Sequence, residues 1–193
     1  MMDDSTNIEP PKILPEIEED TRRLEFNMGS DYQTGVLLRT LAATKPGGRL
    51  LELGTGTGLA TAWILDGMDR DSRLITVDLD PACLEVAKRY LGTDARVVFR
   101  QGDSADVMDS LRGSRFDLIF ADAWAGKFWD FQKAVDLLND GGIYVIDDLL
   151  PAPAWPPDHP PKVDALLERI QNHPALTSLR LSWSTGLVIA VKR

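Results

Sequence analysis

The stretch LLELGTGTGLATAWIL, residues 50–65, decides the fold of this chain. It begins as an apolar run, passes through three glycines at alternate positions and continues into apolar residues at helical spacing. A Gly-rich turn between a strand and a helix is typical of ligand-binding loops in open α/β sheets, because glycine lets the backbone approach a ligand closely. We therefore expect a strand over 49–53, a helix over 59–67 and a binding loop from Gly54 to Gly58.

Outward from this stretch, short runs rich in Val, Ile, Leu and Phe alternate with helical patterns. Strands that are apolar along nearly their whole length, separated by helices, indicate a parallel sheet covered on both faces. The fold class is therefore α/β, with a doubly wound, mostly parallel seven-stranded sheet and a C-terminal antiparallel strand. The expected strands are 49–53, 73–78, 95–100, 116–122, 142–147, 178–183 and 186–192, and the expected helices are 31–44, 59–67, 82–91, 104–111, 128–138 and 161–172.

The composition, 44% hydrophobic and 26% charged in 193 residues, indicates one globular domain. The first twenty residues are acidic and broken by three prolines, so we expect a flexible acidic arm over 1–20 and a single domain over 21–193. The arm lacks the basic and apolar regions of a signal peptide, and no apolar run reaches membrane-spanning length. Cys83 is the only cysteine. A cytoplasmic protein without disulfides is therefore expected.

The formal net charge is -9, from 21 basic and 30 acidic residues, and this charge repels phosphate backbones. We therefore expect a small-molecule acceptor as the partner rather than nucleic acid or a membrane, and a homodimer is left open. Six prolines within 151–161 predict an extended surface loop, which could form a substrate rim.

The glycine spacing favours S-adenosylmethionine (SAM) over NAD. The dinucleotide fingerprint G-x-G-x-x-G is not matched, since Leu59 stands where the last glycine should be. An acidic residue before the loop suits a cationic sulfonium better than a pyrophosphate. Carboxylates after the second and third strands could accept hydrogen bonds from ribose and adenine, although each could also be a solvated loop carboxylate. The candidate cofactor-binding residues are Glu52, Gly54, Thr55, Gly56, Gly58, Asp78, Asp103, Ser104 and Asp122.

Five motifs together resemble those of class I SAM-dependent O-methyltransferases, in particular the catechol and caffeoyl-CoA branch. They are LELGTGTG, TVDLDP, GDS, FDLIFADA and GGIYVIDD, and the similarity runs in order from about Asn27 to Arg193. The resemblance implies a Rossmann-like methyltransferase fold. It also implies O-methylation of a small hydroxylated acceptor, aromatic or catechol-like.

Three carboxylates follow neighbouring strands: Asp122 after the fourth, and Asp147 and Asp148 after the fifth. Such oxygens suit Mg²⁺. The resembled branch holds its metal with an Asp after the fourth strand and an Asp-Asn pair after the fifth, whereas this chain has Asp148 in place of the Asn. Asp122, Asp147 and Asp148 are therefore the candidate ligands for Mg²⁺ or another divalent cation. The alternative is that Asp122 shapes the cofactor pocket while the other two cap backbone or are solvated.

The resembled branch places a lysine three residues after its first metal Asp, where this chain has Ala125. Lys127 could still reach the site, because Gly126 permits unusual backbone angles. Asp122 and Lys127 are therefore the candidate catalytic residues, with Lys127 as general base, and a solvated helix-start lysine is the alternative role. Three tryptophans lie near the same rim. Trp124, Trp129 and Trp155 suit an aromatic substrate or core packing, and His159 is expected at the surface.

Two other functions remain open. The first is methylation of a hydroxylated nucleoside in RNA, which proteins of the resembled branch can perform. The second is SAM binding without catalysis, which the missing lysine and the altered Asp pair would suit. Aminopropyl transfer is disfavoured, because no β-domain is expected before the helix that begins at residue 31.

Overall fold

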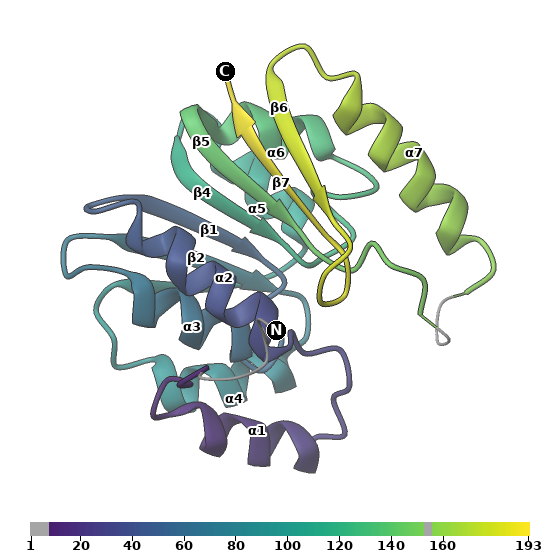
Figure 1. The fold of residues 1–193 in the computed structure, drawn as a ribbon. Coiled ribbons are helices and arrows are strands. Elements are labelled where there is room, and N and C mark those ends of the chain that lie inside the picture. Colours follow the sequence, from purple (N-terminus) through teal and green to yellow (C-terminus); the bar gives the residue numbers. More distant parts are fainter. Residues whose placement is uncertain (1–7, 153–155) are drawn as a thin grey trace.

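A seven-stranded sheet forms the centre of the structure, a computed structural model that describes residues 8–152 and 156–193 (Figure 1). The strand order is β3-β2-β1-β4-β5-β7-β6, and β7 runs antiparallel to both of its neighbours while the other pairs are parallel. This confirms the predicted sheet. The strands are β1 (Arg49–Leu53), β2 (Arg73–Asp78), β3 (Val97–Gln101), β4 (Phe116–Ala121), β5 (Leu138–Ile146), β6 (Leu176–Leu181) and β7 (Leu187–Lys192).

Helices cover both faces of this sheet (Figure 1). One core contains Leu38, Trp63 and Phe120, and the first four helices close it; the other contains Met108 and Phe131, and the last three close it. The helices are α1 (Leu14–Arg23), α2 (Tyr32–Ala43), α3 (Leu59–Gly67), α4 (Pro81–Leu91), α5 (Ser104–Ser110), α6 (Phe131–Leu137) and α7 (His159–Gln171). None of the helices in the described part of the chain is long and apolar enough to cross a membrane.

The topology brings three loops together at the carboxyl edge of the sheet. From β1 the chain builds outward to β2 and β3, then returns to β4 on the other side of β1. The last residue of β1, Leu53, is paired with Val77 of β2 and with Ala121 of β4. Ligands in open α/β sheets bind at such a switch point, outside the carboxyl ends of the strands. The loops that follow β1, β2 and β4 therefore meet where a ligand is expected.

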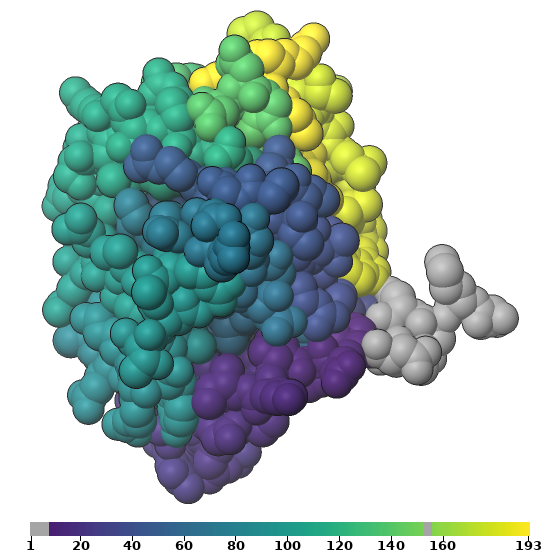
Figure 2. Space-filling model, turned by 90° about the vertical axis from the view of Figure 1, so that its left-hand side faces the viewer, coloured from purple at the N-terminus to yellow at the C-terminus, as the bar shows by residue number. Residues whose placement is uncertain are grey.

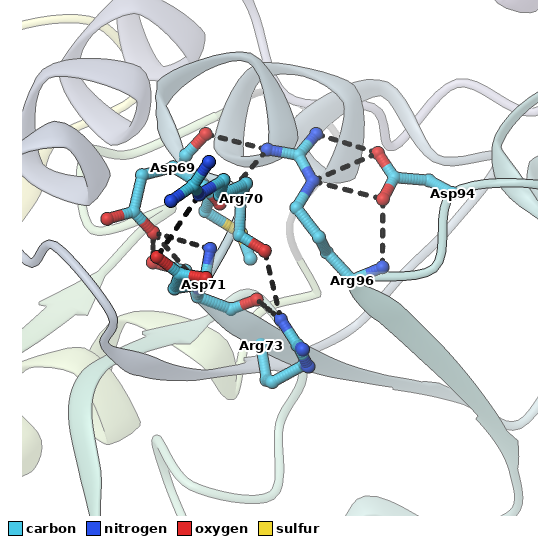
Figure 3. Close-up of polar contacts among 8 residues, drawn as sticks. Asp69, Arg70, Asp71, Arg73, Asp94 and Arg96 are labelled. Carbon is cyan, nitrogen blue, oxygen red and sulfur yellow. Dashed lines mark hydrogen bonds and ion pairs between the residues drawn. The ribbon is translucent and has the colours of Figure 1, made fainter.

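The opposite edge of the sheet is held by a cluster of charged side chains in the loops before β2 and β3 (Figure 3). Arg96 binds Asp94 with an Nη2–Oδ2 distance of 2.7 Å and donates to the carbonyl oxygen of Met68 at 2.6 Å. Asp69 accepts from the backbone N–H of Ser72 at 2.8 Å and of Gly47 at 2.9 Å. These contacts fix the amino ends of three strands, and they lie away from the expected ligand edge.

The predicted flexible arm over 1–20 is wrong for residues 14–20, while its residues 1–7 lie outside the described residues. Residues 14–20, expected to be loosely ordered, form most of helix α1, and it packs through the buried side chains of Leu14 and Ile17. Asp20 accepts from Arg89 at 2.5 Å and from the hydroxyl of Tyr90 at 2.8 Å, both on α4. In Figure 2 the purple N-terminal segment lies directly against the blue and teal surface. The acidic composition suggested disorder, but one of these carboxylates, that of Asp20, is buried and holds α1 on α4.

Helix α1 also touches the glycine loop. The hydroxyls of Thr21 and Thr57 are hydrogen-bonded at 2.7 Å, and Thr21 donates to the carbonyl oxygen of Ile17 at 2.7 Å. Both threonines are buried. The helix therefore supports the back of the loop that the sequence predicts to bind the cofactor.

Several element boundaries differ from those expected. Strand β5 begins at Leu138 rather than 142, and α6 begins at Phe131 rather than 128. The predicted loop over 151–161 ends early, because α7 begins at His159 and takes two prolines into its first turn, where no backbone N–H is needed. Residues 153–155 lie outside the described residues.

We expect Thr21→Val to lower the free energy of unfolding by about 1–2 kcal/mol, because the substitution keeps the shape but removes a buried hydrogen-bond partner of Thr57. Urea unfolding followed by circular dichroism would measure this change. The matched control is Thr40→Val on α2: Thr40 also bonds the carbonyl four residues earlier but is exposed. We expect the control to stay within about 0.5 kcal/mol of the wild type. Equal losses in the two variants would contradict the role of the Thr21–Thr57 contact.

Candidate functional site

A cavity of about 220 Å³ opens at the carboxyl edge of the sheet, beside the glycine loop. Its wall combines the loop after β1, the end of β2, the start of α5 and the loop after β4. Four of the predicted cofactor residues line it, together with two tryptophans: Gly54, Asp78, Asp103, Ser104, Trp124 and Trp129. The structure therefore brings together residues from three separate motifs of the sequence.

The glycine loop passes so close to the end of β4 that a side chain at Gly54 would be tightly crowded. At Gly54, with φ +103, a Cβ atom would lie 3.0 Å from the carbonyl carbon of Asp122. The backbone N–H groups of Gly54 and Thr55 both donate to the carbonyl oxygen of Val77, at 2.9 and 3.0 Å. Gly56 and Gly58 also have positive φ, +52 and +95. The loop is thus fixed to both neighbouring strands before any ligand binds.

Asp78, at the end of β2, is tied to this loop. Its Oδ2 accepts from the backbone N–H of Gly56 at 2.6 Å, and its Oδ1 accepts from that of Asp80 at 2.9 Å. The side chain also lines the cavity, so these hydrogen bonds hold the carboxylate where ribose hydroxyls could reach it. Thr55, in contrast, is buried and bonds the hydroxyl of Thr76. It supports the loop from behind.

Asp103 and Ser104 stand at the start of α5. Asp103 is exposed and caps the helix, because its Oδ1 accepts from the backbone N–H of Ala105 at 2.7 Å. Ser104, the first helical residue, is buried. Both residues border the cavity.

Glu52 lies beneath the loop and is fully buried. Its Oε2 accepts from the hydroxyls of Thr61 and Thr76, each at 2.5 Å. Oε1 is buried without a hydrogen-bond partner among the described residues. Burial raises the pKa of Glu52 to about 8, although the two threonine hydrogen bonds oppose that shift. Glu52 is therefore an internal support of the loop, and only Oε1 is left for a further contact.

An aromatic cluster covers the loop after β4. Trp124 and Trp129 contact each other edge to face, with ring centroids 5.3 Å apart, and both remain more than 40% exposed on the cavity side. Phe128 and Trp124 also pack on the ring of His159, which is only 6% exposed. The prediction of a surface histidine is therefore wrong: the first turn of α7 docks on this cluster. Trp155 lies outside the described residues.

Lys127 is buried, with only 3% of its side chain exposed, so it is not a solvated lysine at a helix start. It reaches inward because Gly126, with φ +91, turns the chain where a Cβ atom would lie 2.6 Å from Leu53. The hydroxyl of Tyr144 donates to the carbonyl oxygen of Gly126 and holds that turn. The Nζ of Lys127 donates to the carbonyl oxygen of Asp147 at 3.1 Å.

Asp122 lies beside this lysine. Its Oδ1 is 3.6 Å from the Nζ of Lys127, and its Oδ2 accepts from the hydroxyl of Ser30 at 3.3 Å. Burial raises the pKa of Asp122 well above its usual value; the charge of Lys127 opposes this shift, and the charges of Asp147 and Asp148 add to it. The structure therefore brings Asp122 and Lys127 side by side, and their catalytic role stays a prediction.

Asp147 and Asp148 follow β5 at the same edge, but their carboxylates are engaged differently. Asp147 is buried, and its Oδ1 accepts from the hydroxyl of Thr185 and from the backbone N–H of Asp148. Asp148 is half-buried with φ +60. Within residues 8–152 and 156–193, no group of three or more Asp, Glu, His or Cys side chains is placed to hold a metal ion. The three predicted ligands therefore lie at one edge, but in the described residues their side chains are not arranged as a metal site.

Two contacts of this edge were missed by the sequence analysis. Ser30 reaches Asp122 from the segment before α2, and Thr185 reaches Asp147 from the β6–β7 turn. Ser184, in the same turn, donates to Asp31 at 2.7 Å. Local sequence carries no signal for partners 38, 92 and 153 residues away.

The buried carboxyl of Glu52 predicts a pH dependence of stability. Its pKa is about 8 in the folded protein against 4.5 for the free side chain, so its contribution is full below pH 4.5 and is lost as the pH rises to about 8. We expect the free energy of unfolding of wild type, relative to Glu52→Gln, to fall by a few kcal/mol over that window. Urea titrations at pH 5, 6.5 and 8 would measure the difference. A constant difference would show that Glu52 ionises normally.

Known proteins resemble this chain in sequence and in structure. A relative from Mycobacterium ulcerans (strain Agy99), named "Putative O-methyltransferase", is 36% identical over 118 residues, which cover 58% of this chain and 52% of the relative. The chain spans about half the length of the curated relatives it matches. Among solved structures, the cofactor-bound protein Rv0187 from MTB has a TM-score of 0.85 at 27% identity, covering 98% of this chain and 94% of that one.

The O-methyltransferase TomG from Streptomyces achromogenes, solved in complex with SAM, also has a TM-score of 0.85, at 22% identity, and the match covers 97% of this chain and 92% of TomG. This likeness shows a shared fold. The family model described as Methyltransferase domain matches residues 51–149, which include the glycine loop, the cavity residues and the edge from Asp122 to Asp148. That match spans just over half of the chain, which therefore belongs to the methyltransferase family.

Proposed function

We propose that this protein transfers the methyl group of SAM to an oxygen atom of a small hydroxylated acceptor. The observation that carries the proposal is the cavity between the glycine loop, Asp78 and the start of α5, at the switch point of a methyltransferase-family sheet. Pockets that hold a whole small molecule measure roughly 300–1,000 Å³. The cavity of about 220 Å³ is smaller and suits the nucleoside part of the cofactor.

The residues around the cavity fit SAM. Asp78 would accept hydrogen bonds from the ribose, Asp103 and Ser104 would bind the adenine edge, and Trp124 would stack on the adenine face. This assigns Trp124 to the cofactor rather than to an aromatic acceptor. The methionine part would follow the loop from Gly54 to Gly58, above the unpartnered Oε1 of Glu52.

The acceptor would bind at the adjoining edge, beside Asp122 and Lys127, which are the proposed catalytic residues. Asp122 lies directly after β4 and contacts the glycine loop through its backbone. When bound, SAM would supply an electrophilic methyl group: the acceptor oxygen would take the methyl, the S–C bonding pair would stay on sulfur, and the hydroxyl proton would pass to solvent water. The exposed residues 150–152 after β5 would form part of the rim.

A divalent cation is not part of the proposal. The residues present do not fit one as they stand: a lysine side chain already binds the carbonyl oxygen of Asp147 and lies beside Asp122, and Thr185 uses the Oδ1 of Asp147. The resemblance to the catechol and caffeoyl-CoA branch of O-methyltransferases supports a catechol-like or other aromatic acceptor. The net charge of -9 favours a small molecule over RNA.

The test is transfer of label from methyl-labelled SAM to a panel of catechols, hydroxycinnamoyl-CoA esters, flavonoids and bulk tRNA. We expect labelled product with at least one small acceptor and none with tRNA. Transfer to tRNA would instead show that the protein methylates RNA. SAM binding without transfer to any member of the panel would favour a non-catalytic SAM-binding protein.

The place of Asp78 in the cavity wall predicts its effect on cofactor affinity. We expect Asp78→Ala to weaken binding of S-adenosylhomocysteine (SAH) by roughly 10–100-fold, because a charged hydrogen-bond acceptor is removed from both the ligand and the loop. Isothermal titration calorimetry would measure it. The matched control is Asp80→Ala: Asp80 caps α4, two residues later, and does not line the cavity. Equal affinity in the Asp78 variant and the wild type would place the cofactor elsewhere.

A further inference from the structure

We propose that the ammonium group of Lys127 occupies the place of a divalent cation in this site, so that methyl transfer by this protein needs no metal ion. The inference rests on the proposed function only for where the acceptor binds. It concerns the charge balance of the edge formed by Asp122, Asp147 and Asp148.

The position of Lys127 joins the ends of two strands. Its Nζ lies 3.1 Å from the carbonyl oxygen of Asp147, after β5, and 3.6 Å from the Oδ1 of Asp122, after β4. Carboxylate and carbonyl oxygens are the ligands that hard cations such as Mg²⁺ and Ca²⁺ take in proteins. Here the ammonium group of Lys127 contacts one carbonyl oxygen and one carboxylate oxygen.

The lysine is held in place rather than mobile. Its side chain is 3% exposed, and a buried lysine is rare unless it is paired with negative charge. The left-handed turn at Gly126 directs it inward, and the hydroxyl of Tyr144, from β5, fixes that turn through the carbonyl oxygen of Gly126. A lysine on this turn therefore has a single defined place, between Asp122 and Asp147.

One carboxylate of the edge is already engaged by the chain itself. The Oδ1 of Asp147 is taken by the hydroxyl of Thr185 and the backbone N–H of Asp148. Within the described ranges, no three Asp, Glu, His or Cys side chains are arranged to hold a metal ion. Where the resembled branch has a lysine, this chain has Ala125, whose side chain is buried. This small side chain leaves room for Lys127. Binding a metal here would require Lys127 to move away.

The test measures Mn²⁺ binding without SAM or acceptor. Wild type and Lys127→Ala are titrated with Mn²⁺, followed by the electron paramagnetic resonance signal of free Mn²⁺ and by thermal unfolding. We expect wild type to bind no Mn²⁺ at millimolar concentration and its Tm to stay unchanged. Lys127→Ala, which leaves the carboxylates without their cation, should bind Mn²⁺ and gain roughly 5 °C in Tm at saturation.

The matched control is Lys133→Ala. Lys133 also contacts two carboxylates, Asp109 at 2.8 Å and Asp130 at 3.0 Å, but its side chain is 32% exposed and does not line the cavity. We expect no Mn²⁺ binding by this variant. If Lys127→Ala does not fold, Lys127→Met keeps the length of the side chain without its charge and is tested in the same way.

Stoichiometric Mn²⁺ binding by the wild type would overturn the proposal, and so would Lys127 variants that fold but gain no Mn²⁺ binding. Methyl transfer adds a separate readout: activity of the wild type should be equal in EDTA and in Mg²⁺. Transfer that is lost in EDTA would contradict the role of Lys127 while supporting the proposed methyltransferase. Failure of all acceptors would contradict the proposed function but leave the metal-binding result standing.

Discussion

The structure depends on the close approach of the glycine loop to the end of β4. Glycine is favoured at Gly54 because the backbone has φ +103 and a Cβ atom would lie only 3.0 Å from the carbonyl carbon of Asp122. This approach brings the loop after β1 and the loop after β4 into contact, while Val77 and Asp78 tie the same loop to β2. The three loops consequently act as one support. The cavity lies on one side of these three loops, and the cluster around Asp122 lies on the other.

Segments far apart in the sequence reinforce this support. Helix α1 holds the glycine loop from behind through Thr21, and the β6–β7 turn holds the end of β5 through Thr185. Beneath the loop, Glu52 is buried with one oxygen fully used and one unpartnered. Acidic groups are thus kept out of water near the place proposed for a cationic sulfonium, and Lys127 is the positive charge that the chain supplies there.

Local sequence predicted the sheet, because each strand is an apolar run and each loop at the carboxyl edge carries its own glycine or aspartate. It also predicted that Asp78, Asp103 and Asp122 share one edge, which follows from parallel topology alone. It failed for α1, whose acidic composition suggested disorder, since Asp20 is paired with groups on α4 some seventy residues away. It failed likewise for the burial of His159, because that burial depends on Trp124 and Phe128 in a distant part of the sequence.

A crystal structure of the complex with SAH tests the central claim most directly. The account predicts that the ribose hydroxyls lie within hydrogen-bond distance of the Asp78 carboxylate, that the adenine ring contacts Trp124 beside Asp103 and Ser104, and that the sulfur lies on the Asp122 side of the glycine loop. A complex with SAH bound away from the loop between Gly54 and Gly58, or with Asp78 turned away from the ligand, would contradict it.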